Sequence, residues 1–139
     1  MPDDIVLDAS VAAKLYFFEQ GTEAARRLID SGVNIEAPEL LFIEMASVAA
    51  KRVRRGLTPP ERAAAAVVAI RGLVVCPIPM AALADQAFAF ARDHGFSAYD
   101  GAYLALAATK GLKVITADIK MVRRASEVGL SGLVRHLEQ

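Results

Sequence analysis

Four acidic residues stand in apolar surroundings where their carboxylates could do chemistry. They are Asp8 in "VLDASV", Glu44 in "PELLFIEMASV", Asp100 in "SAYDGAYLALA" and Asp118 in "VITAD". Glu44 is the least expected of the four, because every other residue from position 40 to position 50 is apolar or small. An isolated buried charge is unfavourable, so such a group is paired, protonated or bound to a metal ion.

Three of these acids also have a local explanation as helix caps. Asp8 and Asp118 follow apolar runs that are typical of strands, and Asp100 stands three residues after Ser97 with the spacing of a capping box. Glu44 lies three residues after Leu41 on one stripe of an expected helix, which turns it toward the buried side or its rim. In a parallel sheet, strand carboxyl ends and helix starts share one edge, so all four acids can converge there.

Convergence of four carboxylates requires protons or cations. Two like charges ~4 Å apart repel by roughly 4 kcal/mol at an effective dielectric constant near 20. Because the ligands would be oxygens, with no histidine or cysteine beside them, the expected ion is Mg²⁺ or Mn²⁺. Whether the site holds one metal ion or two stays open at this point.

The elements that must position these acids alternate short strands with helices. This alternation predicts an α/β fold, a three-layer α/β/α sandwich with a central, mostly parallel sheet. The length predicts a single domain over residues 1–139. Strands are expected at "DIVLD", around residues 33–35, and at "LVVC", "KVIT" and "GLV". Helices are expected at "SVAAKLYFF", "GTEAARRLID", residues 38–55, after "TPPE", and at "MAALADQAFAFARDHG", "SAYDGAYLALAATKG" and "DIKMVRRASEVG".

Several residues receive structural predictions. Thr58 in "TPPE" is expected to cap the helix that follows, and Gly56 to end the helix before it. Cys76 is expected to be buried in the "LVVC" strand. Tyr99 and Tyr103 flank Asp100, where they could stack on a base, but core packing is the favoured expectation.

Composition limits the classes of function. Lys plus Arg equals Asp plus Glu at 16 each, so a nucleic-acid partner would have to meet a local basic patch or bound cations. A single cysteine fits a reducing compartment. The acidic start "MPDDIVLD" is unlike a signal peptide, and the longest uncharged stretch, residues 72–84, is shorter than the ~20 residues of a membrane span. We therefore expect a cytoplasmic protein with no membrane partner.

The four motifs, in this order and spacing, resemble the PIN-domain ribonucleases, and among them the VapC toxins of bacterial toxin–antitoxin pairs. The resemblance implies a Mg²⁺- or Mn²⁺-dependent endoribonuclease that acts on RNA, forms a homodimer and is silenced by a small cognate antitoxin protein. Asp8, Glu44, Asp100 and Asp118 occupy the positions of the family's acidic residues. Thr116 and Ser10 match its hydroxyl residues, whereas Ser47 replaces an asparagine that many members carry.

On this interpretation Asp8, Asp100 and Asp118 bind the metal directly or through water, and Glu44 joins a second ion or orients the attacking water. The hydroxyl of Thr116 or Ser10 could fix a water or a phosphate oxygen. Candidate RNA contacts, beside Ser10 and Ser47, are three cations of "KRVRR" at the end of the Glu44 helix: Lys51, Arg54 and Arg55.

Two other functions stay open. An aspartyl phosphatase or phosphoacceptor could use Asp8 as its nucleophile, although such proteins usually carry another Asp where this chain has Ser10. The alternative is a non-catalytic PIN-like binding module.

Overall fold

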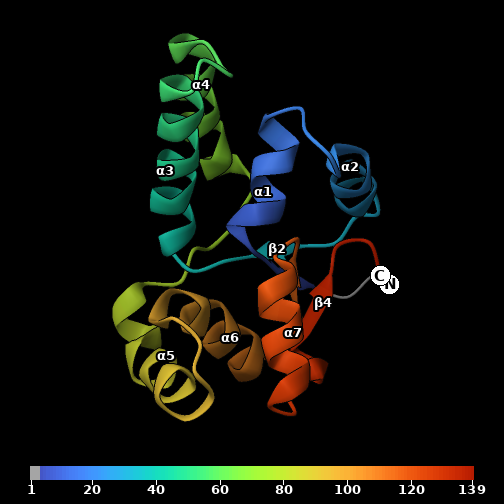
Figure 1. Ribbon diagram of the computed structural model, residues 1–139, viewed down its shortest axis with the longest axis vertical. Coiled ribbons are helices and arrows are strands. Elements are labelled where there is room, and N and C mark those ends of the chain that lie inside the picture. Colours follow the sequence, from blue (N-terminus) through green and yellow to red (C-terminus); the bar gives the residue numbers. More distant parts are fainter. Residues whose placement is uncertain (1–3) are drawn as a thin grey trace.

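Four short parallel strands form the centre of the molecule. The computed structural model describes residues 4–139, so residues 1–3 of the expected domain lie outside the described part (Figure 1). The strands lie in the order β2-β1-β3-β4, with Val6 of β1 opposite Val114 of β3. Their bounds are β1 Ile5–Leu7, β2 Ile35–Glu36, β3 Val114–Thr116 and β4 Val134–His136. All three strand pairs are parallel, as the apolar runs predicted.

Helices cover both faces of this sheet, which confirms the three-layer α/β/α prediction. Side chains alternate along β1, so Ile5 and Leu7 join one hydrophobic cluster and Val6 joins the other. Figure 1 shows the two groups of helices on opposite sides of the strands. One layer contains α1 Ala9–Tyr16, α2 Thr22–Asp30, α3 Leu40–Arg54 and α4 Pro60–Ala69; the other contains α5 Met80–His94, α6 Ala98–Lys110 and α7 Ile119–Glu127. Among the described residues, no helix is long and apolar enough to cross a membrane.

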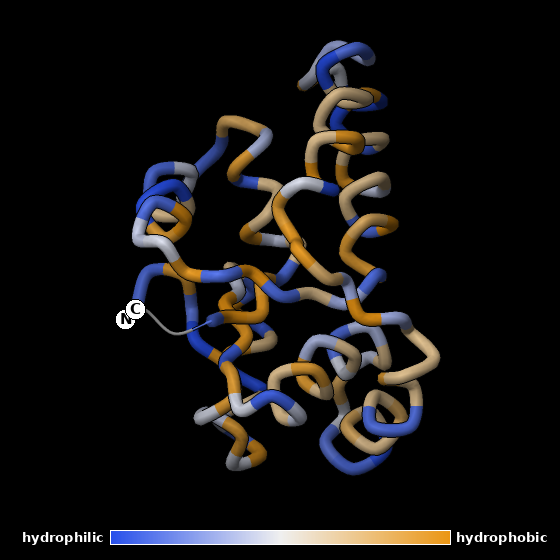
Figure 2. Tube along the Cα trace, turned by 180° about the vertical axis from the view of Figure 1, so that it is seen from behind, coloured by the Kyte–Doolittle hydropathy of each residue, from blue (hydrophilic) through white to orange (hydrophobic). Residues whose placement is uncertain are grey.

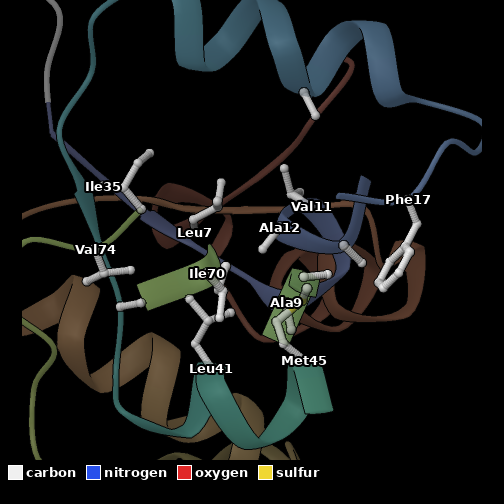
Figure 3. Close-up of a cluster of buried hydrophobic side chains, with 14 of the residues drawn as sticks. Leu7, Ala9, Val11, Ala12, Phe17, Ile35, Leu41, Met45, Ile70 and Val74 are labelled. Atoms are coloured by element: carbon white, nitrogen blue, oxygen red, sulfur yellow. The ribbon is translucent and has the colours of Figure 1, made fainter. Parts of the chain in front are cut away.

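The first layer is held by a continuous apolar stripe of α3. Leu41, Met45 and Ala49 recur at four-residue spacing and belong to the same buried cluster as Leu7 of β1 and Ile70 after α4. Figure 3 shows Leu41 and Met45 within this cluster. Fully burying a side chain of the size of Leu41 or Met45 contributes about 1.5–3 kcal/mol. The stripe therefore fixes the rotation of α3, and with it the direction of Glu44.

The expected "LVVC" strand is wrong. Residues 73–76 form a turn followed by a bend, Val75 is 89% exposed, and Cys76 is exposed rather than buried. Pro77 and Pro79, which follow this run, lack the N–H that β-sheet pairing needs. Within residues 4–139, the pairing near this run is a single isolated β-bridge between Pro38 and Ile78.

The predicted cap at Thr58 is also wrong. Pro59 occupies the N-cap position of α4, and the buried Thr58 hydroxyl accepts a hydrogen bond from Arg52 Nε at 2.9 Å. Arg52 also pairs with Glu19 and lies over the ring of Phe17, so this member of "KRVRR" ties α3 to its own layer. Gly56 does follow the end of α3 with φ of 70°, as expected.

The second layer depends on a close approach between α5 and α6 at Gly101. A Cβ at this position would lie 2.6 Å from the carbonyl oxygen of Ala87. We expect Gly101→Ala to lower the free energy of unfolding by about 1–3 kcal/mol, although alanine normally favours a helix. Thermal denaturation measures the effect, and Gly72→Ala, which meets no atom within 4 Å, is the matched control. Equal melting temperatures for Gly101→Ala and the unmodified chain would contradict this packing.

Candidate active site

Asp8 follows β1 and is buried in a network of hydroxyl groups. Its Oδ2 accepts hydrogen bonds from Ser10 Oγ at 2.6 Å and from Thr116 Oγ1 at 2.8 Å. Asp8 occupies the N-cap position of α1, yet its side chain makes no capping hydrogen bond. The cap explanation is therefore wrong for Asp8, whose carboxylate instead joins β1 to the end of β3.

The same hydroxyls hold the turn after β3, which carries Asp118. The fully buried Thr116 Oγ1 accepts a hydrogen bond from the Asp118 backbone N–H at 3.0 Å. Ser10 Oγ accepts one from the Ala117 N–H at 2.9 Å. Asp118 Oδ1 in turn accepts from the Lys120 N–H at 2.9 Å, so the predicted cap of α7 is confirmed. Thr116 and Ser10 thus fix the relative positions of two acids that are 110 residues apart in sequence.

Asp100 lies in the first turn of α6, as predicted. Ser97 caps the helix and accepts a hydrogen bond from the Asp100 N–H at 3.0 Å. Burial, followed by the negative charges of Asp8 and Asp118, raises the pKa of Asp100 to about 6. Near neutral pH this carboxylate is ionised against the repulsion of its neighbours.

Glu44 reaches the site from α3, in the opposite helical layer. Tyr103 of α6 donates a hydrogen bond from its hydroxyl to Glu44 Oε1 at 2.6 Å. Burial raises the pKa of Glu44, the Tyr103 hydrogen bond lowers it, and the charges of Asp8 and Asp100 raise it further. Burial and the Glu44 and Asp8 carboxylates raise the pKa of Tyr103 far above its ordinary value, so its hydroxyl remains a donor.

Tyr103 is a site residue for which the sequence analysis favoured core packing. Its side chain is fully buried, so packing is half of its role, but its hydroxyl also holds Glu44. A signal was present, because Tyr103 lies three residues after Asp100 on the same face of α6. Tyr99, by contrast, is 65% exposed, and its expected core packing is wrong.

The charges of the four acids influence one another, but their side chains are not arranged as a complete metal-binding site. The negative charge of Asp8 helps to raise the pKa of both Glu44 and Asp100, and the charge of Asp118 helps to raise the pKa of Asp100. Within residues 4–139, no three side chains of Asp, Glu, His or Cys form a group that could hold a metal ion as they stand. Each of Asp8, Glu44 and Asp118 has one oxygen fixed by a hydrogen bond, and the second oxygen receives none from the described residues.

The expected RNA-contacting residues of α3 lie away from the acids. Ser47 is exposed one turn after Glu44, and Lys51, Arg54 and Arg55 follow Glu44 by 7 to 11 residues, or ~10–17 Å along the helix axis. Figure 1 shows the α3–α4 hairpin pointing away from the sheet, and Figure 2 shows its hydrophilic end. The fold does not bring these three cations to the carboxylates, and their RNA contact stays a prediction.

Fold and site together define the class: a three-layer α/β protein with carboxylates from both helical layers along one sheet edge. The chain belongs to the PIN-domain family, whose model matches residues 5–127. Its curated relatives include Ribonuclease VapC3 of Pyrobaculum aerophilum, 32% identical over 124 residues that cover 86% of this chain and 93% of the relative. Ribonuclease VapC12 of Mycobacterium tuberculosis is 32% identical over 120 residues, covering 86% and 90%. The resemblance to VapC-type proteins is thereby confirmed.

Solved structures share the fold at lower identity. VapC20 of Mycobacterium tuberculosis, described as a sarcin–ricin loop cleaving toxin, has a TM-score of 0.69 at 23% identity and covers 86% of this chain and 94% of its own. PAE2754 of Pyrobaculum aerophilum has a TM-score of 0.73 at 18% identity, covering 97% and 84%. A toxin–antitoxin complex from Klebsiella pneumoniae has a TM-score of 0.65 at 16% identity, covering 96% and 98%.

Proposed function

We propose that this chain is a metal-dependent endoribonuclease, the toxin of a VapBC-like toxin–antitoxin pair, that hydrolyses RNA phosphodiester bonds at its four carboxylates. The observation that carries this proposal is the proximity of acids from the end of β1, from α3 and α6 and from the β3–α7 turn. Burial, followed by the charges of neighbouring carboxylates, raises the pKa values of Asp100 and Glu44 there. The names of the curated relatives support the reaction class.

The donor set fits a hard divalent cation. Asp8, Asp100 and Asp118 offer carboxylate oxygens, the ligands that Mg²⁺ and Mn²⁺ prefer. A cation would offset both the burial and the neighbouring negative charges that raise the pKa of Asp100. When bound, such an ion supplies charge neutralisation at the phosphate and a water of lowered pKa. We assign Asp8, Asp100 and Asp118 as its ligands, directly or through water, whereas Glu44 would join a second ion or orient the attacking water.

The remaining chemistry belongs to the chain's own side chains. Ser10 and Thr116 hold Asp8 Oδ2, which leaves Oδ1 to face the site. Tyr103 holds Glu44 Oε1, which leaves Oε2 to accept a hydrogen bond from the attacking water. The water oxygen would form a bond to phosphorus as the bond from phosphorus to the ribose oxygen breaks. Glu44 would accept a proton from the water, and the departing ribose oxygen would take a proton from solvent.

Partners follow from the same family. The Klebsiella structure is titled a toxin–antitoxin complex, and we infer a small antitoxin as partner of this chain. Large exposed apolar side chains such as Phe18 and Ile43 offer surface for the antitoxin or for a homodimer. We propose that the chain acts in the cytoplasm as one nuclease domain.

The test is cleavage of total RNA by the purified chain with Mg²⁺ or Mn²⁺, with and without a chelator. We expect discrete products only when the free metal is present, because the carboxylates alone repel the phosphate. Cleavage that persists in excess chelator would contradict the metal dependence. No cleavage of any RNA pool with either metal would contradict the nuclease assignment, and a covalent phosphate on Asp8 after incubation with a phosphate donor would favour the phosphatase instead.

A further inference from the structure

An open hollow adjoins two of the four acids on the side of α7. It has a volume of about 370 Å³, within the range of about 300–1,000 Å³ for small-ligand sites. One wall is the turn at residues 95–97, and the opposite wall is α7. Its polar lining consists mainly of Asp100 and Asp118 toward the acids and of Lys120, Arg123, Arg124 and Glu127 along α7.

The α7 wall of this hollow is a cationic helix face. Lys120, Arg123 and Arg124 stand at i, i+3 and i+4, so they lie on one side of the helix and repel one another. Among the salt bridges of residues 4–139, none neutralises Lys120 or Arg123. Arg124 meets Glu127 at 3.6 Å, but both side chains are about half exposed, so this pair is weak.

Arg124 lies against the opposite wall. A Cβ at Gly95 would lie 3.8 Å from Arg124 Cζ, so the guanidinium approaches the turn that leads into α6. Gly95 has φ of 74°, a conformation that suits glycine and lets this turn run directly from the end of α5 to Ser97. The guanidinium therefore spans the hollow between α7 and the turn that leads into α6 and Asp100.

We propose that this hollow binds an RNA phosphate next to the scissile one, through Lys120, Arg123 and Arg124. The proposal rests on the endoribonuclease function above and names the path of its substrate. An anion held here would adjoin Asp100 and Asp118, whereas the cations at the end of α3 are ~10–17 Å beyond Glu44. The RNA strand would therefore run from the carboxylates along α7. A phosphate bound there would relieve the repulsion among Lys120, Arg123 and Arg124.

The test measures the affinity of the protein for a labelled single-stranded RNA that the unmodified chain has been shown to cleave. All proteins compared carry Asp100→Asn, so that the RNA is not cleaved during the measurement. We expect Arg124→Gln to raise Kd about tenfold and to reduce the slope of log K against log salt by about 0.7–1, the loss of one phosphate contact. Arg26→Gln, an equally charged change on the exposed side of α2, is the matched control and should leave Kd within about twofold.

Two results would overturn the assignment, and neither is confused with failure of the proposed function. One is an Arg124→Gln variant with unchanged Kd and salt slope. The other is a loss of affinity in Arg54→Gln alone, which would direct the strand along α3. Failure of the unmodified chain to cleave any RNA is a separate result that removes the nuclease function. The same Arg124→Gln and Arg26→Gln comparison, made on a labelled single-stranded RNA that the chain binds, then still decides whether the hollow holds a phosphate.

Discussion

Asp100→Asn is expected to lower RNA cleavage by at least about 10²-fold while making the metal-free protein more resistant to heat at neutral pH. The loss of activity follows because the amide offers one neutral ligand atom in place of a carboxylate. The gain in stability follows because Asp100 is ionised although it is partly buried and close to the charges of Asp8 and Asp118, and the neutral amide removes both costs.

The pH dependence of this stability has a definite sign. The pKa of Asp100 is about 6 in the fold and 3.8 in its ordinary state, so the folded chain holds the proton more tightly. Stability from this group is present below about pH 4 and is lost as the pH rises to about 6. Partial solvent screening reduces the effect to the order of 1 kcal/mol, or about 3 °C in Tm, at pH 7.

Thermal denaturation of the two proteins from pH 4 to pH 8, with and without Mg²⁺, measures both effects. We expect the advantage of Asp100→Asn at pH 7 to vanish near pH 4, and Mg²⁺ to raise the Tm of the unmodified chain alone. Asp85→Asn, the same exchange at an exposed position of α5, is the control and should change neither property. An Asp100→Asn variant that cleaves RNA at the normal rate would defeat the assignment.

Tyr103→Phe is expected to lower cleavage by about 10–100-fold, the usual effect of removing a group that orients a functional side chain. The variant keeps the buried ring but loses the hydrogen bond to Glu44 Oε1. That hydrogen bond lowers the pKa of Glu44, so its loss lets burial and the Asp8 and Asp100 charges raise the pKa further. Cleavage by the variant should therefore recover partly as the pH rises.

Cleavage rates across pH, compared with the melting temperature of each protein, separate this role from simple loss of packing. Tyr99→Phe is the matched control, because Tyr99 is exposed and lies on the same helix. A Tyr103→Phe variant with an unchanged pH profile would show that Glu44 is held by other means.

The positions of the acids could be predicted from the sequence because they depend on short-range rules. Apolar runs indicated β1 and β3, parallel strands end at a common edge, and Ser97 marked the start of α6. The links between the acids could not be predicted in the same way. Thr116 to Asp8 spans 108 residues and Tyr103 to Glu44 spans 59, so both depend on the packing of layers rather than on local spacing.

The two wrong structural predictions, the strand at residues 73–76 and the cap at Thr58, both relied on local sequence patterns. An apolar run predicted a strand at residues 73–76. Pro77 and Pro79, which follow it, have no N–H for strand pairing, and Val75 lies in solvent. The "TPPE" pattern predicted a cap at Thr58, but its hydroxyl is used by Arg52 from the preceding helix. In both places a tertiary contact or a missing donor overrides a local preference.

The hydrogen bond from Tyr103 to Glu44 also joins the two helical layers, since α6 and α3 belong to hydrophobic clusters on opposite faces of the sheet. Local opening of either layer would therefore disassemble the acid group before the whole chain unfolds. If mild denaturant unfolds α5 and α6 locally, RNA cleavage should be lost while the backbone amides of α1, α3 and β1 are still protected from hydrogen exchange.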